Sequence, residues 1–424
     1  MSDGQHCGRE LYDNESCIFH SNNKNKDVEL FQKNLDEIFK DESLENYDLT
    51  HFIFPEGVVF PERFSKRVFF LGATFDGEAD FFDTVFEDEA NFSGADFQGE
   101  ANFIHAVFNN WGNFFGAGFE GDATFIRAVF KGKANFGVAV FKNDANFEDA
   151  TFWDEADFVQ ATFEGTLVLA QLKKDQQISF LPQLDFRRVK FSKPERVQFQ
   201  KVDLSYVRFL ETDLRKVHFT DVDWNKEKGK GRNRVFDEVS HDPFTKKFDY
   251  ALIAQLYRRL RANYEENLRY SEAGDFYIGE MEMTRKAERS IFKKLPLLFY
   301  KAISNYGESY YRPLCWILAI LLIFPLLFMF AGIQPISLDP NNPKADVIHY
   351  RLDFSSTGSF LPTTEKIGDY YTSFLYSMSV FSFIRDKKYT TIDNWGHTLF
   401  VIESILSPVT LAFFLLALRR RFKR

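Results

Sequence analysis

The chain has 424 residues, 45% of them hydrophobic and 27% charged, with a formal net charge of −9 at pH 7. This length leaves room for about two or three domains. A mean hydropathy of −0.29 indicates that most of the chain faces water. The chain has no Ser-His-Asp order, paired-carboxylate site or phosphate-binding glycine loop, which argues against an enzyme.

Residues 1–26 hold two of the three cysteines together with two histidines. The four residues, in the pattern H-C-x9-C-x2-H, are His6, Cys7, Cys17 and His20. Thiolates and imidazoles in this number suit tetrahedral Zn²⁺, and so short a polar segment needs such a cross-link to fold alone. A zinc-binding N-terminal segment is one expectation, and a disordered tail with two free thiols is the other.

Residues 27–47 are predicted to form a helix that caps the segment after it. Apolar side chains recur at helical spacing on one face, and these are Val28, Phe31, Leu35 and Ile38. Acidic residues and lysines occupy the opposite face. This amphipathic pattern is typical of a cap that covers the open end of a repeat structure.

An internal repeat occupies residues 48–224. The motif alanine, any residue, phenylalanine occurs fifteen times, and from Phe75 to Phe163 the phenylalanines are alternately six and five residues apart. This spacing fits neither the period of a helix nor that of a plain strand. An eleven-residue unit, with one small and one large inward side chain in each half, is typical of a solenoid. From Phe199 the spacing becomes a plain five residues.

These Ala-x-Phe triplets resemble the pentapeptide-repeat family, in the variant with one extra residue in every second pentapeptide. The resemblance implies a right-handed quadrilateral β-helix with four pentapeptides per coil, in which the phenylalanines point inward. The repeat would then form about seven or eight coils, stacked at about 4.8 Å. Because the repeat core is structural, any function is expected on the outer faces.

The outer faces of this repeat are acidic. Between residues 66 and 164 the chain has 18 Asp and Glu against 6 Lys and Arg. Some soluble members of the pentapeptide-repeat family mimic DNA and occupy a type II topoisomerase, and that role requires an acidic rod. A solvated surface that resists aggregation explains the same charges. We expect no direct contact with nucleic acid, and a cytoplasmic protein partner on the β-helix is a hypothesis.

Residues 225–242 are predicted to be a charged linker with glycines, and residues 243–312 a helical neck. The neck shows helical spacing of apolar residues in its first half and again over about residues 271–291. This pair resembles the helical pair seen between pentapeptide repeats and channel segments in some bacterial and archaeal proteins. The stretch 295–310 is expected to be an interfacial helix on the inner leaflet.

Residues 313–424 contain two apolar stretches, 314–333 and 398–418, each as long as the roughly 20 residues that cross a bilayer as a helix. Basic residues precede the first stretch and follow the second, and basic flanks stay on the cytoplasmic side. We therefore expect a multi-pass protein of the plasma (inner) membrane, in contact with membrane lipid. Its N- and C-termini are expected in the cytoplasm.

Residues 374–383, and Trp395-Gly396-His397 before the second apolar stretch, resemble the two-transmembrane ion-channel family. The resemblance implies a homotetramer that passes small ions, with a re-entrant pore helix and filter-like loop at residues 370–389. The filter-like residues are Ser382, Phe383, Ile384, Arg385, Asp386, Lys387 and Lys388. Basic residues replace both glycines of the potassium signature Thr-x-Gly-Tyr/Phe-Gly, so potassium selectivity is not expected. A ring of basic charge and an ordinary solvated loop are the two interpretations.

Two residues of the second apolar stretch, Glu403 and Pro408, are candidate functional residues. A charge inside a membrane costs on the order of 3 kcal/mol in insertion scales, so Glu403 is expected to face the pore helix or the pore. Pro408 is a candidate kink that would suit a gate.

The sequence thus predicts a multidomain β + α membrane protein: a β-helix, a helical neck and two transmembrane helices with a re-entrant pore helix. The favoured function is a channel or channel-like pore that is not potassium-selective, with the repeat domain as a cytoplasmic sensor or scaffold. The alternative is a membrane-tethered scaffold or DNA mimic whose pore module does not conduct.

Overall fold

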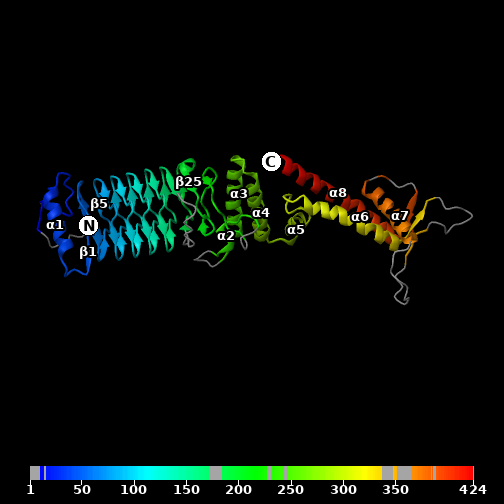
Figure 1. Cartoon of the computed structure of the whole chain (residues 1–424), viewed down its shortest axis with the longest axis horizontal. Coiled ribbons are helices and arrows are strands. Elements are labelled where there is room, and N and C mark those ends of the chain that lie inside the picture. The colour runs from blue at the N-terminus through cyan, green and yellow to red at the C-terminus, as the bar shows by residue number, and fades with distance from the viewer. Residues whose placement is uncertain are drawn as a thin grey trace, which may run out of the picture. The chain divides into compact units, whose positions relative to one another are not determined.

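The computed structural model divides the chain into two compact units, Met1–Ala287 (unit 1) and Glu288–Arg424 (unit 2). Figure 1 labels their elements, with unit 1 in blue to green and unit 2 in yellow to red. The structure describes residues 10–13, 16–171, 184–226, 231–241, 247–336, 347–350, 364–382, 384 and 388–423.

The first helix of unit 1 is α1 (Val28–Lys40). The Asp27 side chain caps it by accepting a hydrogen bond from the backbone N–H three residues on. Phe31, on the buried face of α1, packs edge-on against Phe54 in the solenoid. The predicted cap over residues 27–47 is helical only within α1, because the chain then enters the first strand.

Short strands form four parallel sheets, which are the four sides of a β-solenoid. The first side is β1 (Asn46–Asp48), β4 (Arg67–Phe69), β8 (Ala90–Asn91), β12 (Gly112–Asn113), β16 (Ala134–Asn135), β20 (Ala156–Asp157), β23 (Leu184–Asp185) and β26 (Val207–Arg208). The second is β2 (Ile53–Phe54), β5 (Thr74–Phe75), β9 (Asp96–Phe97), β13 (Gly118–Phe119), β17 (Val140–Phe141), β21 (Thr162–Phe163) and β24 (Lys190–Phe191). The third is β3 (Arg63–Phe64), β7 (Val85–Phe86), β11 (Val107–Phe108), β15 (Val129–Phe130) and β19 (Thr151–Phe152). The fourth is β6 (Ala79–Asp80), β10 (Ala101–Asn102), β14 (Ala123–Thr124), β18 (Ala145–Asn146), β22 (Leu167–Ala170), β25 (Val197–Gln200) and β27 (His218–Thr220).

The register of the strands sets the length of a coil. Ala101 pairs with Ala79 on one side and with Ala123 on the other, so one coil takes 22 residues, the difference between 101 and 79. Two of the predicted eleven-residue units therefore make one coil, and equivalent residues stack on one another. The sheets give about seven coils, as the sequence predicts.

The core of the solenoid consists of stacked phenylalanine columns. The ring of Phe97 lies 4.7 Å from that of Phe75 and 4.8 Å from that of Phe119, each at an angle of 1°. Phe103, from a neighbouring column, meets Phe97 edge-on. These rings are fully buried, as the predicted inward position requires. Burying one Phe side chain contributes about 1.5–3 kcal/mol, so the repeated rings hold the coils together.

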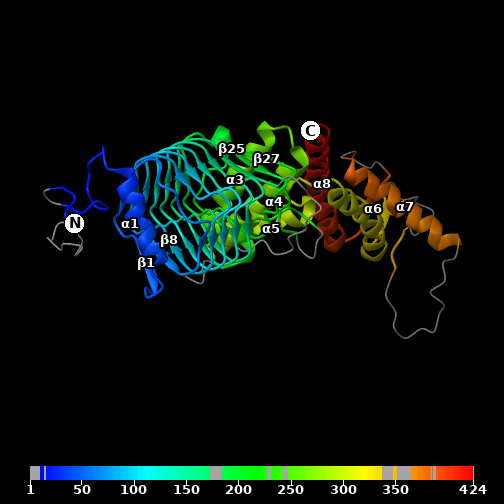
Figure 2. The same ribbon diagram turned by 60° about the vertical axis from the view of Figure 1, so that its left-hand side comes forward.

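Three helices cover the C-terminal end of the solenoid: α2 (Phe236–Val239), α3 (Tyr250–Glu266) and α4 (Tyr270–Ala287) (Figure 1). Figure 2 shows α3 and α4 from another side. Asn263 of α3 donates hydrogen bonds to the carbonyls of Leu214 and Val217 in the last coil, at 2.8 and 2.7 Å. These contacts satisfy backbone groups that an open end would leave unpaired.

The predicted linker over residues 225–242 is packed in its described part. It contains α2, and the Val235 side chain is fully buried. The predicted neck over residues 243–312 is divided between the two units, because α3 and α4 lie in unit 1 and the next helix lies in unit 2.

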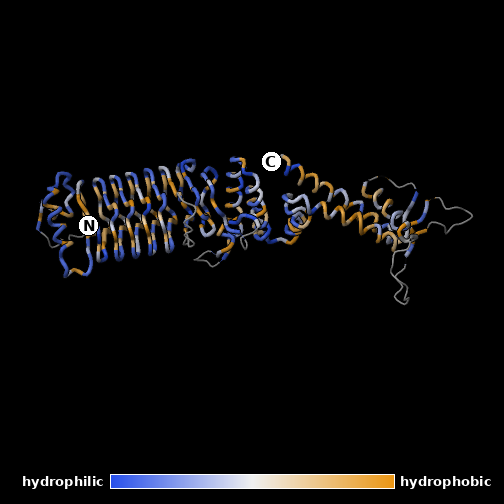
Figure 3. Tube along the Cα trace, viewed as in Figure 1, coloured by the Kyte–Doolittle hydropathy of each residue, from blue (hydrophilic) through white to orange (hydrophobic). Residues whose placement is uncertain are grey.

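The elements of unit 2 are α5 (Ile291–Ser304), α6 (Tyr311–Ala331), β28 (Ile333–Pro335), α7 (Thr364–Phe381), β29 (Tyr389–Thr391) and α8 (Asn394–Lys423). Two of them, α6 and α8, are long and apolar enough to cross a membrane, and both are largely orange in Figure 3. They contain most of the two predicted apolar stretches: α6 begins three residues before 314–333 and ends two residues before its end, and α8 extends beyond 398–418 at both ends. After α6 the chain turns at Gly332 into β28, which pairs antiparallel with β29.

Candidate functional site: a buried polar cluster in unit 2

Glu403 is a fully buried carboxylate nine residues after Asn394, the first residue of α8. Its Oε1 accepts a hydrogen bond of 2.5 Å from the Ser377 hydroxyl of α7. The structure therefore places Glu403 against the helix that the sequence assigns to the pore. Pro408 lies five residues further along, inside the same continuous helix.

Two further buried serines lie one helical turn from this contact, one on each helix. Ser373 and Ser377 are one turn apart in α7, and Ser407 is one turn after Glu403 in α8; all are buried. Among the described residues, Ser373 Oγ, Ser407 Oγ and Glu403 Oε2 have no hydrogen-bond partner. A buried polar atom without a partner costs about 1–3 kcal/mol. These buried polar atoms of α7 and α8 are therefore open to a further hydrogen-bond partner such as a water molecule.

The filter-like segment is only partly described. Phe383, Arg385, Asp386 and Lys387 lie outside the described residues. Three described residues at its ends are anchored through backbone groups. Ser382 Oγ donates to the Met378 carbonyl at 2.7 Å, Ile384 N to the Ser379 carbonyl at 2.9 Å, and Ile336 N to the Lys388 carbonyl at 2.8 Å. The segment thus leaves the end of α7 and returns beside the strand that follows α6.

The helix α7 packs against α6 as well as α8. The Tyr376 ring lies edge-on to Phe328 with centroids 5.0 Å apart. The Tyr370 hydroxyl donates to the Leu322 carbonyl of α6 at 3.3 Å. Unlike its neighbours, α7 is not apolar enough to count as a candidate span. Unit 2 therefore has a shorter, more polar helix between two long apolar ones.

The basic end of α8 is tied to the turn between α5 and α6. Arg420 donates to the Tyr306 carbonyl at 3.1 Å and pairs with Glu308 at 3.3 Å. The helix α5 exposes large apolar side chains, among them Phe292, which is 88% exposed. Lysines lie among these apolar residues. The helix α5 begins four residues before the predicted interfacial helix at 295–310 and ends six residues before its end, and contact with a membrane stays a prediction.

The N-terminal zinc cluster predicted from the sequence is half described. Cys17 Sγ lies 3.1 Å from His20 Nδ1, while His6 and Cys7 lie outside the described residues. In the part of the chain that the structure describes, no three His, Cys, Asp or Glu side chains gather as a metal site would need.

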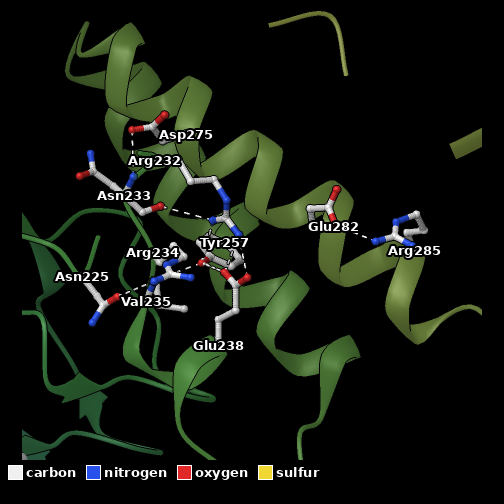
Figure 4. Close-up of polar contacts among 10 residues, drawn as sticks. All are labelled: Asn225, Arg232, Asn233, Arg234, Val235, Glu238, Tyr257, Asp275, Glu282 and Arg285. Atoms are coloured by element: carbon white, nitrogen blue, oxygen red, sulfur yellow. Dashed lines mark hydrogen bonds and ion pairs between the residues drawn. The ribbon is translucent and has the colours of Figure 1, made fainter. Parts of the chain in front are cut away.

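A buried ionic network at the C-terminal end of the solenoid was not predicted from the sequence (Figure 4). Arg232 binds both oxygens of Glu238, at 2.7 and 2.6 Å, and its other Nη donates to the Tyr257 hydroxyl at 3.1 Å. Tyr257 in turn donates to Glu238 and accepts from the Val235 N–H. Burial, with the Glu238 carboxylate beside it, raises the pKa of Tyr257 well above its usual range, so the hydroxyl keeps its proton. A Cβ on Gly279 would lie 2.6 Å from the Tyr257 ring, which explains the glycine.

A second buried acid of this region is Asp237 in α2. It accepts a hydrogen bond of 3.0 Å from the Phe209 N–H of the solenoid. Burial raises the pKa of Asp237 from its usual 3.8 to about 6. Asp237 thus joins α2 to the solenoid, and the Arg232 network joins Glu238 of α2 to Tyr257 of α3.

The acidic faces of the solenoid are partly neutralised along the stacking direction. Lys133 pairs with Glu155 at 3.0 Å and Lys142 with Glu120 at 2.6 Å, each 22 residues away and therefore one coil apart. Such exposed pairs contribute little stability. They show that charge on these faces follows the coil repeat.

Comparison with known proteins identifies the repeat. Residues 125–170 match the family model for pentapeptide repeats (9 copies). The uncharacterized protein MJ1147 of Methanocaldococcus jannaschii is 30% identical over 145 residues, which are 30% of this chain and 31% of that protein. No solved structure matches the chain significantly. Unit 1 therefore contains a pentapeptide-repeat β-solenoid, and the family match, which ends at residue 170, does not extend to unit 2.

Proposed function

We propose that this protein is a membrane pore for small ions that is not selective for potassium, with the pentapeptide-repeat solenoid as a cytoplasmic scaffold or sensor. In this proposal α6 and α8 span the plasma (inner) membrane, and α7 is a re-entrant pore helix. Four copies assemble around a central axis, as in the channel family that the sequence resembles.

The observation that carries the proposal is the contact between Ser377 and Glu403. The contact supports a placement of the C-terminal part of α7 beside the interior of α8, about two and a half turns after the first residue of α8. The following segment returns to β29, directly before α8. A polar helix that dips between two apolar spans and returns to the same side is the arrangement of a pore module.

The charge of the filter-like segment supports an ion other than potassium. In a four-fold assembly Arg385, Lys387 and Lys388 each become a ring of positive charge, which repels cations and favours anions. The basic end of α8, with Arg420 held by Glu308, supports a cytoplasmic C-terminus.

Ion-substituted flux from liposomes tests the proposal. Liposomes that contain the full chain should release chloride faster than potassium or sodium. The double variant Arg385→Gly/Lys387→Gly should lose this anion preference, whereas Lys216→Gly on the solenoid surface should keep it. If no small ion crosses under any gradient or voltage, the pore is disproved and the membrane-tethered scaffold is left as the function.

A further inference from the structure

One side of α5 in unit 2 is an apolar stripe that stays exposed in the described part of the chain. Residues three and four apart share one side of a helix, so the large apolar side chains of α5 form a continuous surface. They are between 49% and 88% exposed, and they are Ile291, Phe292, Leu295, Leu298 and Phe299. A continuous apolar surface of this kind indicates contact with lipid or with another protein.

The rest of α5 is held against the two candidate spans. The Tyr300 ring stacks on Phe413 of α8 with ring centroids 5.4 Å apart. Arg312, near the start of α6, donates to the Lys301 carbonyl at 3.1 Å. The helix α5 therefore lies beside the first turn of α6 and the C-terminal part of α8, while its apolar stripe is left exposed.

Positive charge borders the stripe. Lys294 and Lys301 are seven residues apart, about two turns, so both lie along one edge of the stripe, and α5 has no acidic residue. Further basic residues stand at the adjoining ends of α6 and α8, and these are Arg312, Arg419 and Arg421. A helix with an apolar stripe edged by lysines suits a membrane surface, where the lysine stems lie along hydrocarbon and the ammonium groups reach the headgroups.

Charge decides which partner fits the stripe. A second copy of α5 would bring the same lysines together, and like charges oppose that contact. A lipid without net charge would cover the apolar side chains but gain little from the lysines. An anionic phospholipid offers acyl chains to the stripe and negative charge to the ammonium groups.

We propose that α5 is a docking surface for anionic phospholipid, with acyl chains against Phe292 and Leu295 and headgroup phosphates at Lys294 and Lys301. This inference rests on the membrane insertion of α6 and α8 in the proposed function. It adds the class of lipid that the protein binds and the residues that select it.

Quenching of tryptophan fluorescence by brominated lipids tests the surface. The full chain with Phe292→Trp is placed in nanodiscs of equal phosphatidylglycerol and phosphatidylcholine, with one lipid brominated at a time. The signal is the difference from the wild type, because the chain has 5 tryptophans of its own. Brominated phosphatidylglycerol should quench the added fluorescence more than brominated phosphatidylcholine does.

Two variants calibrate the quenching. Leu322→Trp, on the exposed face of α6, should be quenched by both lipids alike if the span is inserted. Val59→Trp, at an exposed position of unit 1, should be quenched by neither. An unquenched Leu322 variant would show that α6 does not insert, which overturns the proposed function and this inference with it.

Removal of the lysines tests the selectivity. Each lysine near an anionic surface favours binding by about five-fold, so Lys294→Gln/Lys301→Gln should reduce the preference for phosphatidylglycerol by up to about 30-fold at low salt. Lys33→Gln/Lys40→Gln removes two exposed lysines at the same spacing in α1 and should keep the preference. All three variants need no new core contact, because the changed side chains lie at the surface or its edge.

Three results overturn the docking surface. They are equal quenching of the Phe292 variant by the two lipids, no quenching of it while the Leu322 variant is quenched, and a preference that survives loss of both α5 lysines. Chloride flux from liposomes of the same lipids keeps the two proposals apart. Flux without a lipid preference overturns the docking surface alone, and a lipid preference without flux overturns the pore alone.

Discussion

The two units differ in where their large apolar side chains lie. In unit 1 the large rings point into the solenoid, and Phe103 is fully buried among rings of its own and neighbouring coils. In unit 2 large apolar side chains of α6 face outward, and Leu318 and Leu322 are 51% and 57% exposed. Unit 1 completes its own core, whereas α6 leaves large apolar side chains uncovered by the described residues, and in the proposed function lipid or further copies of the chain cover them.

The largest expected effect is the loss of a core ring. Phe103→Ala removes a side chain stacked between Phe81 and Phe125, at 5.0 and 4.9 Å. It should lower the free energy of unfolding of the solenoid by about 3–5 kcal/mol. Phe82→Ala, at a position 54% exposed, is the control and should cost less than about 0.5 kcal/mol. Urea unfolding followed by hydrogen exchange of the coils measures both, and equal losses would contradict the inward columns.

The outward face of unit 2 can be tested with a charge. Leu318→Arg places a guanidinium on the exposed face of α6. If that face contacts lipid, the substitution should make the free energy of membrane insertion of α6 less favourable by about 3 kcal/mol. Val59→Arg makes the same kind of change at an exposed solenoid position and should not alter the membrane fraction. Unchanged insertion of the Leu318 variant would show that α6 does not meet lipid.

A pH effect distinguishes the C-terminal end of the solenoid from the regular coils. Because burial raises the pKa of Asp237 from 3.8 to about 6, the folded state binds more protons than the unfolded state between these values. The free energy of unfolding contributed by Asp237 should therefore rise as pH falls through about 6, by up to about 3 kcal/mol near pH 4. Hydrogen exchange at Phe209, whose N–H it binds, measures the effect.

Asp237→Asn is the matched control, because its side-chain oxygen can still accept from the Phe209 N–H. This variant should lose the pH dependence that Asp237 adds to exchange at Phe209. An unchanged pH profile in the variant would assign the titration to another group.

The smallest expected effect concerns the polar cluster. Ser377→Ala removes the hydrogen bond to buried Glu403 and should lower the stability of unit 2 in detergent by about 1–3 kcal/mol. Ser382→Ala, an exposed serine at the end of α7, should leave the thermal unfolding midpoint unchanged. Equal midpoints for both variants would mean that the contact adds nothing to helix packing.

The solenoid was predictable from the sequence because the same structural unit repeats along it. Every coil offers each residue the same neighbours, so one motif fixes the inward position of Phe97 and of its stacked equivalents. The buried ionic network of unit 1 lies where this period ends. Arg232 and Glu238 are six residues apart, Tyr257 lies 19 residues after Glu238, and the three follow no period. Nothing in their local sequence distinguishes them from surface residues.

The candidate site was predictable by half. Glu403 stands out in the sequence as the charge within an apolar run, but a serine such as Ser377 carries no signal of its own. Its partnership comes from the packing of α7 on α8. The pairing of β28 with β29 was also missed, because three-residue strands are too short to show an alternating pattern.

The reversal potential of the full chain in a planar bilayer tests the central claim most directly. Under a gradient of potassium chloride, the proposed pore should reverse toward the chloride equilibrium potential. Replacing potassium by sodium should leave this value unchanged, because the filter-like segment lacks both glycines of the potassium signature. Reversal at the potassium equilibrium potential, or a membrane that stays silent at every voltage, would contradict the account.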